Sequence, residues 1–222
     1  MSNILLTGGT GYIGSHTCIQ LLKEGNNVCV IDSLINSSES AIFKINKILE
    51  LSNSTTKGNL IFKKGDLKDK VFLENIFKDF ADQENCFDAV IHFAGLKSVT
   101  DSMNMPIKYW RENLNLTLNL IEIMNNFNCN NLVFSSSASL YEPNNKGIFN
   151  EESPTNPINP YGNTKLAIEN MLGDLTKDKS NNWRIIILRY FNPVGAHISG
   201  LIGENPKGTP DNLFPILLKV AS

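Results

Sequence analysis

Several features that define whole classes of protein are missing from this sequence of 222 residues. No apolar run reaches the roughly 18 residues that a membrane-spanning helix needs. The short apolar stretch near the start runs directly into glycines, so we expect no secretory signal. The formal net charge is −2, which gives no electrostatic reason to expect a nucleic-acid or membrane partner. These absences together favour a cytoplasmic protein.

Metal-binding patterns are missing too. The four cysteines are Cys18, Cys29, Cys86 and Cys129, and no two of them stand at Cys-x-x-Cys spacing. The three histidines do not cluster with them. We therefore predict no zinc site and no other metal site. Without an export signal, the cysteines are expected to be reduced and buried.

Short apolar runs alternate with longer amphipathic stretches along the whole chain. The runs are rich in Val, Ile, Leu and Phe with little polar alternation, which is typical of parallel strands buried on both faces. Strands that alternate with helices indicate right-handed crossovers, so we expect an α/β fold with a doubly wound, Rossmann-like parallel sheet. The expected strands are residues 3–7, 27–31, 60–64, 89–93, 132–135 and 184–189, and the expected helices are residues 12–24, 39–51, 69–80, 106–126, 160–178 and 213–221.

The first predicted strand ends in a glycine-rich turn that opens a helix. Gly9, Gly11 and Gly14 satisfy the pattern Gly-x-Gly-x-x-Gly. Glycine lets backbone N–H groups approach a pyrophosphate, and the helix N-terminus adds unpaired donors and the positive end of its dipole. Asp32 ends the second predicted strand, where an acid can accept hydrogen bonds from the adenosine ribose. Because a carboxylate would repel a 2′-phosphate, we expect NAD rather than NADP.

Hydroxyl and amino side chains form a second pattern. Tyr161 and Lys165 lie four residues apart in a predicted helix and so share one face of it. An ammonium group beside a phenol lowers the tyrosine pKa, which would let Tyr161 act as a general base near neutral pH. Ser137 ends a serine run at the same sheet edge as the glycine-rich turn, where its hydroxyl can meet a reacting oxygen. Taken alone, each feature has a plain alternative: two unrelated helix residues, and a serine that closes a turn.

Longer stretches match one family closely. Residues 7–17 read Thr-Gly-Gly-Thr-Gly-Tyr-Ile-Gly-Ser-His-Thr, and residues 92–97 read His-Phe-Ala-Gly-Leu-Lys. Residues 189–197 read Arg-Tyr-Phe-Asn-Pro-Val-Gly-Ala-His, and Asn212-Leu213 with Pro215 extends the match. Together with the serine run and Tyr-x-x-x-Lys, these stretches resemble the extended short-chain dehydrogenase/reductases, and among them the UDP-glucose 4-epimerases.

The resemblance implies a reaction and a bound NAD. In such an enzyme Tyr161 would take the proton from the sugar 4-hydroxyl while NAD takes the hydride from C4, giving a 4-keto sugar. The sugar would rotate, and hydride and proton would return, so that UDP-galactose and UDP-glucose interconvert. Lys165 would hold the nicotinamide ribose and lower the pKa of Tyr161, and Ser137 would hydrogen-bond the reacting oxygen. The catalytic residues expected from the resemblance are thus Ser137, Tyr161 and Lys165.

The resemblance also assigns the ligand contacts. The expected NAD contacts are Gly8, Gly9, Gly11, Tyr12, Ile13, Gly14, Asp32, Asn36, Asp66, Leu67, Phe93, Ala94, Lys97, Asn113, Tyr161, Lys165 and Phe191. The expected UDP-sugar contacts are Lys97, Ser137, Tyr161, Asn192, Asn212 and Leu213. We expect an NAD-binding domain over residues 1–191 and the beginning of a smaller UDP-sugar-binding domain over residues 192–222.

The sequence departs from the family pattern in two places. Family members usually have Gly after the tyrosine that follows the serine run, whereas Glu142 follows Tyr141 here. Gly tolerates a positive φ and Glu does not readily do so, so this loop is expected to take another path. Family members also continue well past residue 215, so the resemblance implies that the chain corresponds to only part of a member.

Two other functions stay open. A related nucleotide-sugar dehydratase would need an Asp-Glu pair just after the serine run, where residues 138–142 read Ala-Ser-Leu-Tyr-Glu. A chain that binds NAD without turnover is the other alternative, since much of the UDP-binding part of the family would be absent.

The family commonly pairs two long helices of each subunit, so residues 106–126 and 160–178 predict a homodimer.

Overall fold

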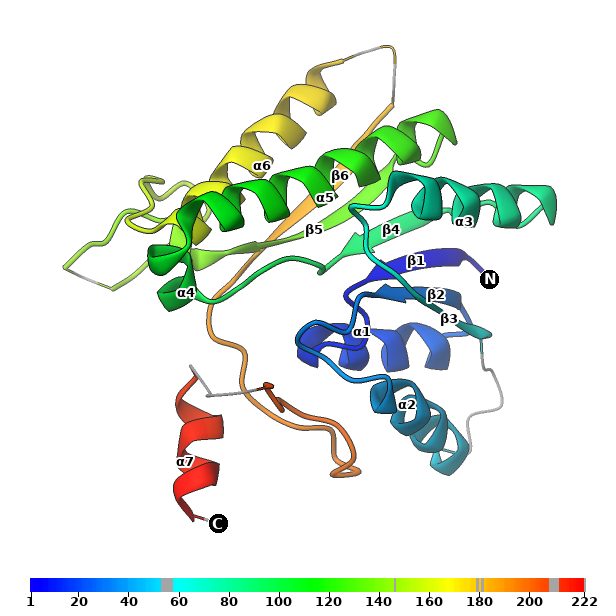
Figure 1. Ribbon diagram of the computed structural model, residues 1–222, viewed down its shortest axis with the longest axis horizontal. Helices are drawn as coiled ribbons and strands as arrows, with labels where there is room; N and C mark the ends of the chain where they lie inside the picture. Colours follow the sequence, from blue (N-terminus) through cyan, green and yellow to red (C-terminus); the bar gives the residue numbers. More distant parts are fainter. Residues whose placement is uncertain (53–57, 146, 179, 181, 208–211, 222) are drawn as a thin grey trace.

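The computed structural model describes residues 1–52, 58–145, 147–178, 180, 182–207 and 212–221. In this part of the chain, six strands form one parallel sheet in the order β3-β2-β1-β4-β5-β6 (Figure 1). The strand order reverses between β1 and β4, and ligands bind in open α/β sheets at the carboxyl ends of strands beside such a reversal. The strands are β1 (Asn3–Thr7), β2 (Asn27–Asp32), β3 (Leu60–Lys64), β4 (Ala89–His92), β5 (Asn131–Ser137) and β6 (Arg184–Tyr190).

Helices cover both faces of the sheet. Figure 1 shows α3, α5 and α6 on one face and α1 with α2 on the other. Successive residues of β1 point to opposite faces of the sheet. Leu5 packs in the core with α3, α5 and α6, and Leu6 packs in the core with α1 and α2. The helices are α1 (Tyr12–Lys23), α2 (Ser40–Leu51), α3 (Lys70–Asp82), α4 (Val99–Asn104), α5 (Pro106–Asn126), α6 (Pro160–Lys177) and α7 (Leu213–Ala221), with a 3₁₀ turn at Ala138–Leu140.

The predicted doubly wound parallel sheet is confirmed, and its strands start and end within two residues of the expected positions. The sequence did not predict α4, which begins at Ser98, where the side chain accepts a hydrogen bond from the Asp101 N–H. This helix has only 6 residues, too few to show a helical period. The expectation that all cysteines are buried was wrong for Cys86, which is exposed between α3 and β4.

The segment that follows β6 runs back across the sheet edge towards α1. The Tyr12 hydroxyl donates to the Gly195 carbonyl at 2.7 Å, and Lys207 Nζ donates to the Leu34 carbonyl at 2.9 Å. Ile202 is buried in the core formed with α1 and α2. By contrast, α7 stands apart from the sheet in Figure 1, and most of its apolar side chains are exposed. No helix within the described ranges has both the length and the apolar character to cross a membrane.

Candidate active site

The glycine-rich loop between β1 and α1 leaves no room for side chains. A Cβ on Gly14 would lie 2.3 Å from the Gly8 carbonyl oxygen, and a Cβ on Gly8 would lie 2.7 Å from the Ala94 nitrogen. Gly8 also has a φ of +70°, which side chains rarely adopt. Gly11 caps α1 without a side-chain hydrogen bond, so the first N–H groups of α1, including those of Tyr12 and Ile13, have no acceptor in their own helix. Such a cradle suits a pyrophosphate.

Asp32 lies at the end of β2 beside this loop. It is buried, and its Oδ1 accepts hydrogen bonds from the Leu34 N–H and the Ser37 hydroxyl, both at 2.9 Å. Its Oδ2 accepts from the Thr10 N–H at 3.1 Å. Because a carboxylate oxygen can accept more than one hydrogen bond, Oδ2 keeps capacity for a ribose hydroxyl. The position and orientation therefore fit the expected role of Asp32.

The residues expected around the adenosine lie on the same side of the sheet. Asp66 and Leu67 follow β3; Leu67 is buried, and Asp66 accepts the Lys68 N–H at 2.9 Å. Asn36 is exposed in the loop after β2. Phe93 and Ala94 are partly buried directly after β4. Gly9 has its Cα against β2, since a Cβ there would meet the Val30 side chain at 2.8 Å.

Ser137, Tyr161 and Lys165 come together where β5 meets the beginning of α6. Ser137 is the last residue of β5; its hydroxyl oxygen accepts the Ser139 N–H at 3.2 Å, and its side chain acts to lower the pKa of Tyr161. Lys165 Nζ lies 5.9 Å from the centre of the Tyr161 ring. Asn159 caps α6 by accepting the Gly162 N–H at 2.8 Å, which fixes the start of the helix next to Tyr161. The arrangement places a phenol, a hydroxyl and an ammonium group at the ligand edge of the sheet.

The pKa of Tyr161 is raised in this structure and not lowered as the Tyr-x-x-x-Lys spacing predicted. Burial raises the pKa of Tyr161, and the Ser137 side chain opposes that rise. The physical reason is that desolvation disfavours the phenolate. Lys165 itself hydrogen-bonds the Ser135 carbonyl at 2.7 Å instead of the phenol.

The ammonium group of Lys165 is buried as well. It lies 4.7 Å from the centre of the Phe134 ring. Burial lowers the pKa of Lys165 to about 8, and the charge of Glu169 opposes that fall. Lys165 therefore begins to lose its charge just above neutral pH, so its electrostatic support for a phenolate is limited to the pH range below that value.

A buried polar chain, in which the sequence predicted a role only for Asn113, runs beneath this site. The His92 Nδ1 lies 2.7 Å from the Thr7 hydroxyl, and the His92 Nε2 lies 3.1 Å from the Thr117 hydroxyl. Thr117 in turn donates to the Asn113 carbonyl at 2.8 Å. The side-chain amide of Asn113 hydrogen-bonds to other residues of the chain: its Oδ1 accepts the Leu96 N–H at 2.8 Å, and its Nδ2 donates to the Thr164 hydroxyl at 3.1 Å. Asn113 thus fixes the position of the loop after β4 by its hydrogen bond with Leu96.

His92 makes stability depend on acidity. Burial, followed by the charge of Lys165, lowers the pKa of native His92 to about 3, whereas an unfolded histidine titrates near 6.5. Between these values only the unfolded chain binds the proton at this histidine, so protonation favours unfolding. The free energy of unfolding is therefore unaffected by protonation of His92 above about pH 6.5 and decreases as the pH falls towards 3. We expect His92→Gln to reduce the slope of unfolding free energy against pH by up to about 1.4 kcal/mol per pH unit in this window.

Urea unfolding of both proteins at several pH values between 7 and 4 measures that slope. The comparison uses the slope and not the stability itself, because the variant also changes the hydrogen bonds to Thr7 and Thr117. Equal slopes for the two proteins would mean that His92 takes up its proton equally in the native and unfolded states.

The expected UDP-sugar residues are only partly brought together. Lys97 Nζ lies 3.9 Å from Glu204 Oε1, and the Asn212 amide donates to the same carboxylate oxygen. Glu204, which the sequence did not single out, therefore joins two of the predicted residues. Asn192 and Leu213 are exposed.

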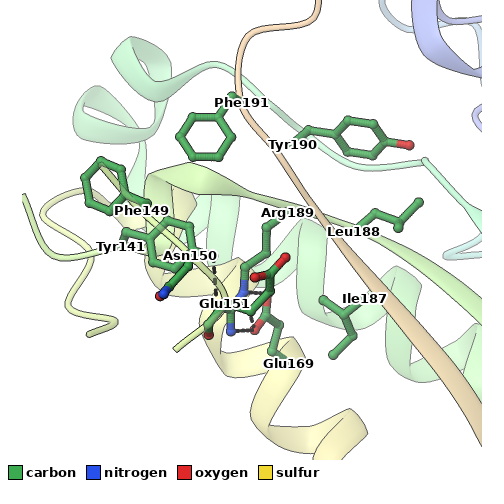
Figure 2. Close-up of a pocket in the computed structure, with 10 residues that line it drawn as sticks. All are labelled: Tyr141, Phe149, Asn150, Glu151, Glu169, Ile187, Leu188, Arg189, Tyr190 and Phe191. Carbon is green, nitrogen blue, oxygen red and sulfur yellow. Dashed lines mark hydrogen bonds and ion pairs between the residues drawn. The ribbon is translucent and has the colours of Figure 1, made fainter. Parts of the chain in front are cut away.

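Phe191, an expected cofactor contact, lies near two aromatic side chains of the loop after β5. Its ring centre is 6.4 Å from that of Tyr141 and 6.2 Å from that of Phe149, in a cavity of about 590 Å³ beside β6. Figure 2 shows Tyr190 pointing away from this aromatic group, and the Tyr190 ring lies 6.3 Å from that of Phe93. Tyr190 ends β6 and Phe191 directly follows the strand, and the two rings thus contact different aromatic side chains.

The loop after Ser137 keeps an ordinary backbone at the position where Gly was expected. Glu142 does not take a positive φ, and its N–H donates to the Pro154 carbonyl at 2.8 Å. Tyr141 pairs with Thr155 in an antiparallel bridge. The predicted departure of the loop thus involves no backbone strain at Glu142.

The fold and site together define a class of protein: a dinucleotide-binding α/β fold with a glycine-rich loop and a group of Ser, Tyr and Lys side chains at the carboxyl edge of the sheet. Comparison with known proteins agrees with this class. The NAD dependent epimerase/dehydratase family matches residues 4–221. The chain belongs to this family.

Named relatives and solved structures are close to this chain over its whole length. UDP-glucose 4-epimerase 1 of Oryza sativa subsp. japonica is 48% identical over 221 residues, which are 100% of this chain and 60% of the relative. The structure of UDP-glucose 4-epimerase from Bifidobacterium longum in complex with NAD⁺ and UDP has a TM-score of 0.89 at 42% identity, covering 99% of this chain and 62% of that one. The epimerase structure from Stenotrophomonas maltophila, with bound NAD and formylated UDP-arabinopyranose, has a TM-score of 0.88 at 41% identity, covering 100% of this chain and 62% of that one. The chain thus spans about 60% of the length of these relatives.

Proposed function

We propose that this chain binds NAD and interconverts UDP-galactose and UDP-glucose by inverting C4 of the sugar. The observation that carries the proposal is the grouping of Ser137, Tyr161 and Lys165 where β5 meets α6, at the sheet edge that also holds the glycine-rich loop. The relatives named UDP-glucose 4-epimerase support the same substrate class.

The residues of the cofactor site fit NAD. The loop in which Gly8 and Gly14 exclude side chains suits the pyrophosphate, and Asp32 suits the two ribose hydroxyls of NAD while repelling a 2′-phosphate. When bound, NAD supplies reversible acceptance of a hydride at C4 of the sugar. Lys165 would hold the nicotinamide ribose in place of its contact with the Ser135 carbonyl.

Proton transfer is the part of the reaction that the side chains perform. The Tyr161 oxygen would take the proton from the 4-hydroxyl and later return it to the 4-keto oxygen. The Ser137 hydroxyl would hydrogen-bond the same sugar oxygen and hold it at the phenol. Because burial raises the pKa of Tyr161, the positive charge of Lys165 is needed to stabilise the phenolate as it forms.

The dehydratase alternative is less well supported. The 3₁₀ turn after Ser137 carries Ala138, Ser139 and Leu140, none of which can exchange the proton that loss of water from the sugar requires. Glu142 is exposed beyond this turn. Nothing at the end of β5 therefore supplies the expected Asp-Glu pair within the described loop.

The substrate site extends beyond the NAD-binding domain in this proposal. Residues 1–191 form the NAD-binding domain, and residues 192–222 begin the part that holds the UDP-sugar through Lys97, Asn192, Asn212 and Leu213. The cluster of Lys97, Asn212 and Glu204 supports the placing of two of these residues near one another. A cytoplasmic location, expected from the sequence, stays a prediction.

We propose that two copies of the chain associate through α5 and α6. Exposed apolar side chains on α5 support this, among them Ile107 at 69%, Trp110 at 39% and Leu118 at 47% exposure. Replacing Leu118 by Glu places a charge in that surface and is expected to shift sedimentation from dimer to monomer. A wild-type protein that sediments as a monomer at all concentrations would contradict the proposal.

The proposed function is tested by mixing the purified chain with NAD⁺ and UDP-galactose and following the sugar anomeric protons by NMR. We expect the signals of UDP-glucose to appear until both sugars reach equilibrium. If the folded chain binds NAD but leaves UDP-galactose unchanged, it is an NAD-binding unit without turnover.

A further inference from the structure

An ion pair between buried Glu169 and partly exposed Arg189 ties the helix that carries Tyr161 to the strands beside it. Glu169 lies on α6 one turn after Lys165 and two turns after Tyr161, on the same helix face. Its side chain is only 6% exposed. The Arg189 guanidinium donates to it with Nη2 at 2.8 Å from Oε2 and Nε at 3.2 Å from Oε1 (Figure 2).

The same carboxylate also holds the end of β5. The Ser136 hydroxyl donates to Glu169 Oε1, and Ser136 lies opposite Arg189 in the register of β5 and β6. Lys165 donates to the carbonyl of the preceding residue, Ser135, at 2.7 Å. Two successive residues are thus fastened to α6 directly before Ser137, so the position of α6 on β5 sets the position of the Tyr161 phenol at the Ser137 hydroxyl.

Arg189 extends these contacts to the loop that leaves Ser137. Its Nη1 donates to the Tyr141 hydroxyl at 3.2 Å and to the Glu151 carbonyl at 3.1 Å, and its guanidinium lies 5.0 Å from the centre of the Tyr141 ring. Only the planar, multi-donor group of arginine can make all of these contacts at once. Ion pairs that include a buried charge are often no more stabilising than apolar residues of similar size. The fixed geometry of the Glu169–Arg189 pair therefore explains its presence better than a gain in stability does.

We propose that Glu169 and Arg189 are a positioning pair for proton transfer, a role that rests on the proposed function of Tyr161. The pair fixes α6 against the ends of β5 and β6 and thereby sets the position of the Tyr161 phenol relative to the Ser137 hydroxyl. Neither side chain touches the reacting atoms in this account.

The pKa of Tyr161 reports this arrangement without any turnover, because the Ser137 side chain lowers that pKa. Tyrosines are replaced by 3-fluorotyrosine, and the Tyr161 signal is assigned in ¹⁹F spectra with Tyr161→Phe. Arg189→Lys keeps the charge but loses the planar fork, so we expect an upward shift of the Tyr161 pKa. Ser137→Ala removes the hydroxyl directly and is expected to raise the pKa as well. Combining the two substitutions should then give no further rise.

A second variant separates positioning from stability. Replacing Glu169 and Arg189 together by Met leaves the net charge unchanged and leaves neither charge without its partner, so the fold is expected to persist. We still expect the Tyr161 pKa to rise. The matched control is Glu74→Gln, which breaks the exposed Glu74–Lys78 pair on α3 and should leave the Tyr161 pKa unchanged.

The outcomes distinguish this proposal from the proposed function. An unchanged Tyr161 pKa in Arg189→Lys and in the double Met variant, with a rise in Ser137→Ala, would overturn the positioning role alone. An unchanged pKa in Ser137→Ala would remove the Ser137–Tyr161 contact on which both proposals depend. Rises in all three variants, with none in the control, are the result we expect.

Discussion

Replacing Tyr161 by Phe is expected to lower the rate of C4 epimerisation by about 10²- to 10⁴-fold, the usual contribution of a positioned acid or base. The substitution removes one oxygen atom, the atom that would accept and return the proton of the 4-hydroxyl. NAD affinity is expected to change little, because the glycine-rich loop and Asp32 lie on other elements. The anomeric NMR assay measures the rate, and a fluorescence titration with NAD measures the affinity.

Tyr109→Phe is the matched control for this substitution. Tyr109 is 3% exposed on α5, so the variant also removes a buried phenol oxygen, but at a position outside the proposed proton path. Its turnover should equal that of the unchanged chain. If Tyr161→Phe lost NAD binding together with activity, the assignment of Tyr161 as the base would not hold.

Replacing Gly14 by Ala is expected to weaken NAD binding strongly. The new Cβ would lie 2.3 Å from the Gly8 carbonyl oxygen and 2.8 Å from the Gly9 Cα, and both are backbone atoms that cannot rotate away. Relieving such overpacking costs about 1–3 kcal/mol, which corresponds to roughly a 5- to 150-fold rise in the Kd for NAD if the loop distorts only where NAD binds. Calorimetric titration with NAD measures the change.

Gly173→Ala provides a control for this second substitution. Gly173 lies inside α6, and a Cβ there would meet nothing within 4 Å. Alanine should therefore raise stability by about 0.5–1 kcal/mol through its better helix propensity and leave the Kd unchanged. Equal NAD affinities for the Gly14 and Gly173 variants would show that the close packing of the loop does not govern binding.

The sheet could be predicted from the sequence because parallel strands buried on both faces read as unbroken apolar runs. In β2, for example, Val28, Cys29, Val30 and Ile31 are all buried, with neighbours divided between the two cores. Ser137, Tyr161 and Lys165 could be predicted as a group only through the family resemblance, because the strand end and the helical spacing taken alone left plain alternatives. The six residues of α4 gave no such period, so that helix was not predicted.

Other parts of the site depend on tertiary contacts that no local pattern contains. The pKa of Tyr161 follows from its burial, which the Tyr-x-x-x-Lys spacing does not reveal. Glu169 and Arg189 meet only because β6 pairs with β5 in the observed register. Glu204 joins Lys97 and Asn212 across three separate segments. His92 stood in a matched stretch, yet only the packing of β4 against α5 shows its hydrogen bonds.

The most direct test of the account uses UDP-galactose that carries deuterium at C4, mixed with the chain and NAD⁺ in ordinary water. If hydride leaves C4 for a bound cofactor and returns to the other face while Tyr161 exchanges only the hydroxyl proton, the UDP-glucose formed will keep its deuterium at C4. NMR of the product measures the retained label. Product that has lost the deuterium to solvent would contradict the account, because C4 would then have exchanged a proton and not a hydride.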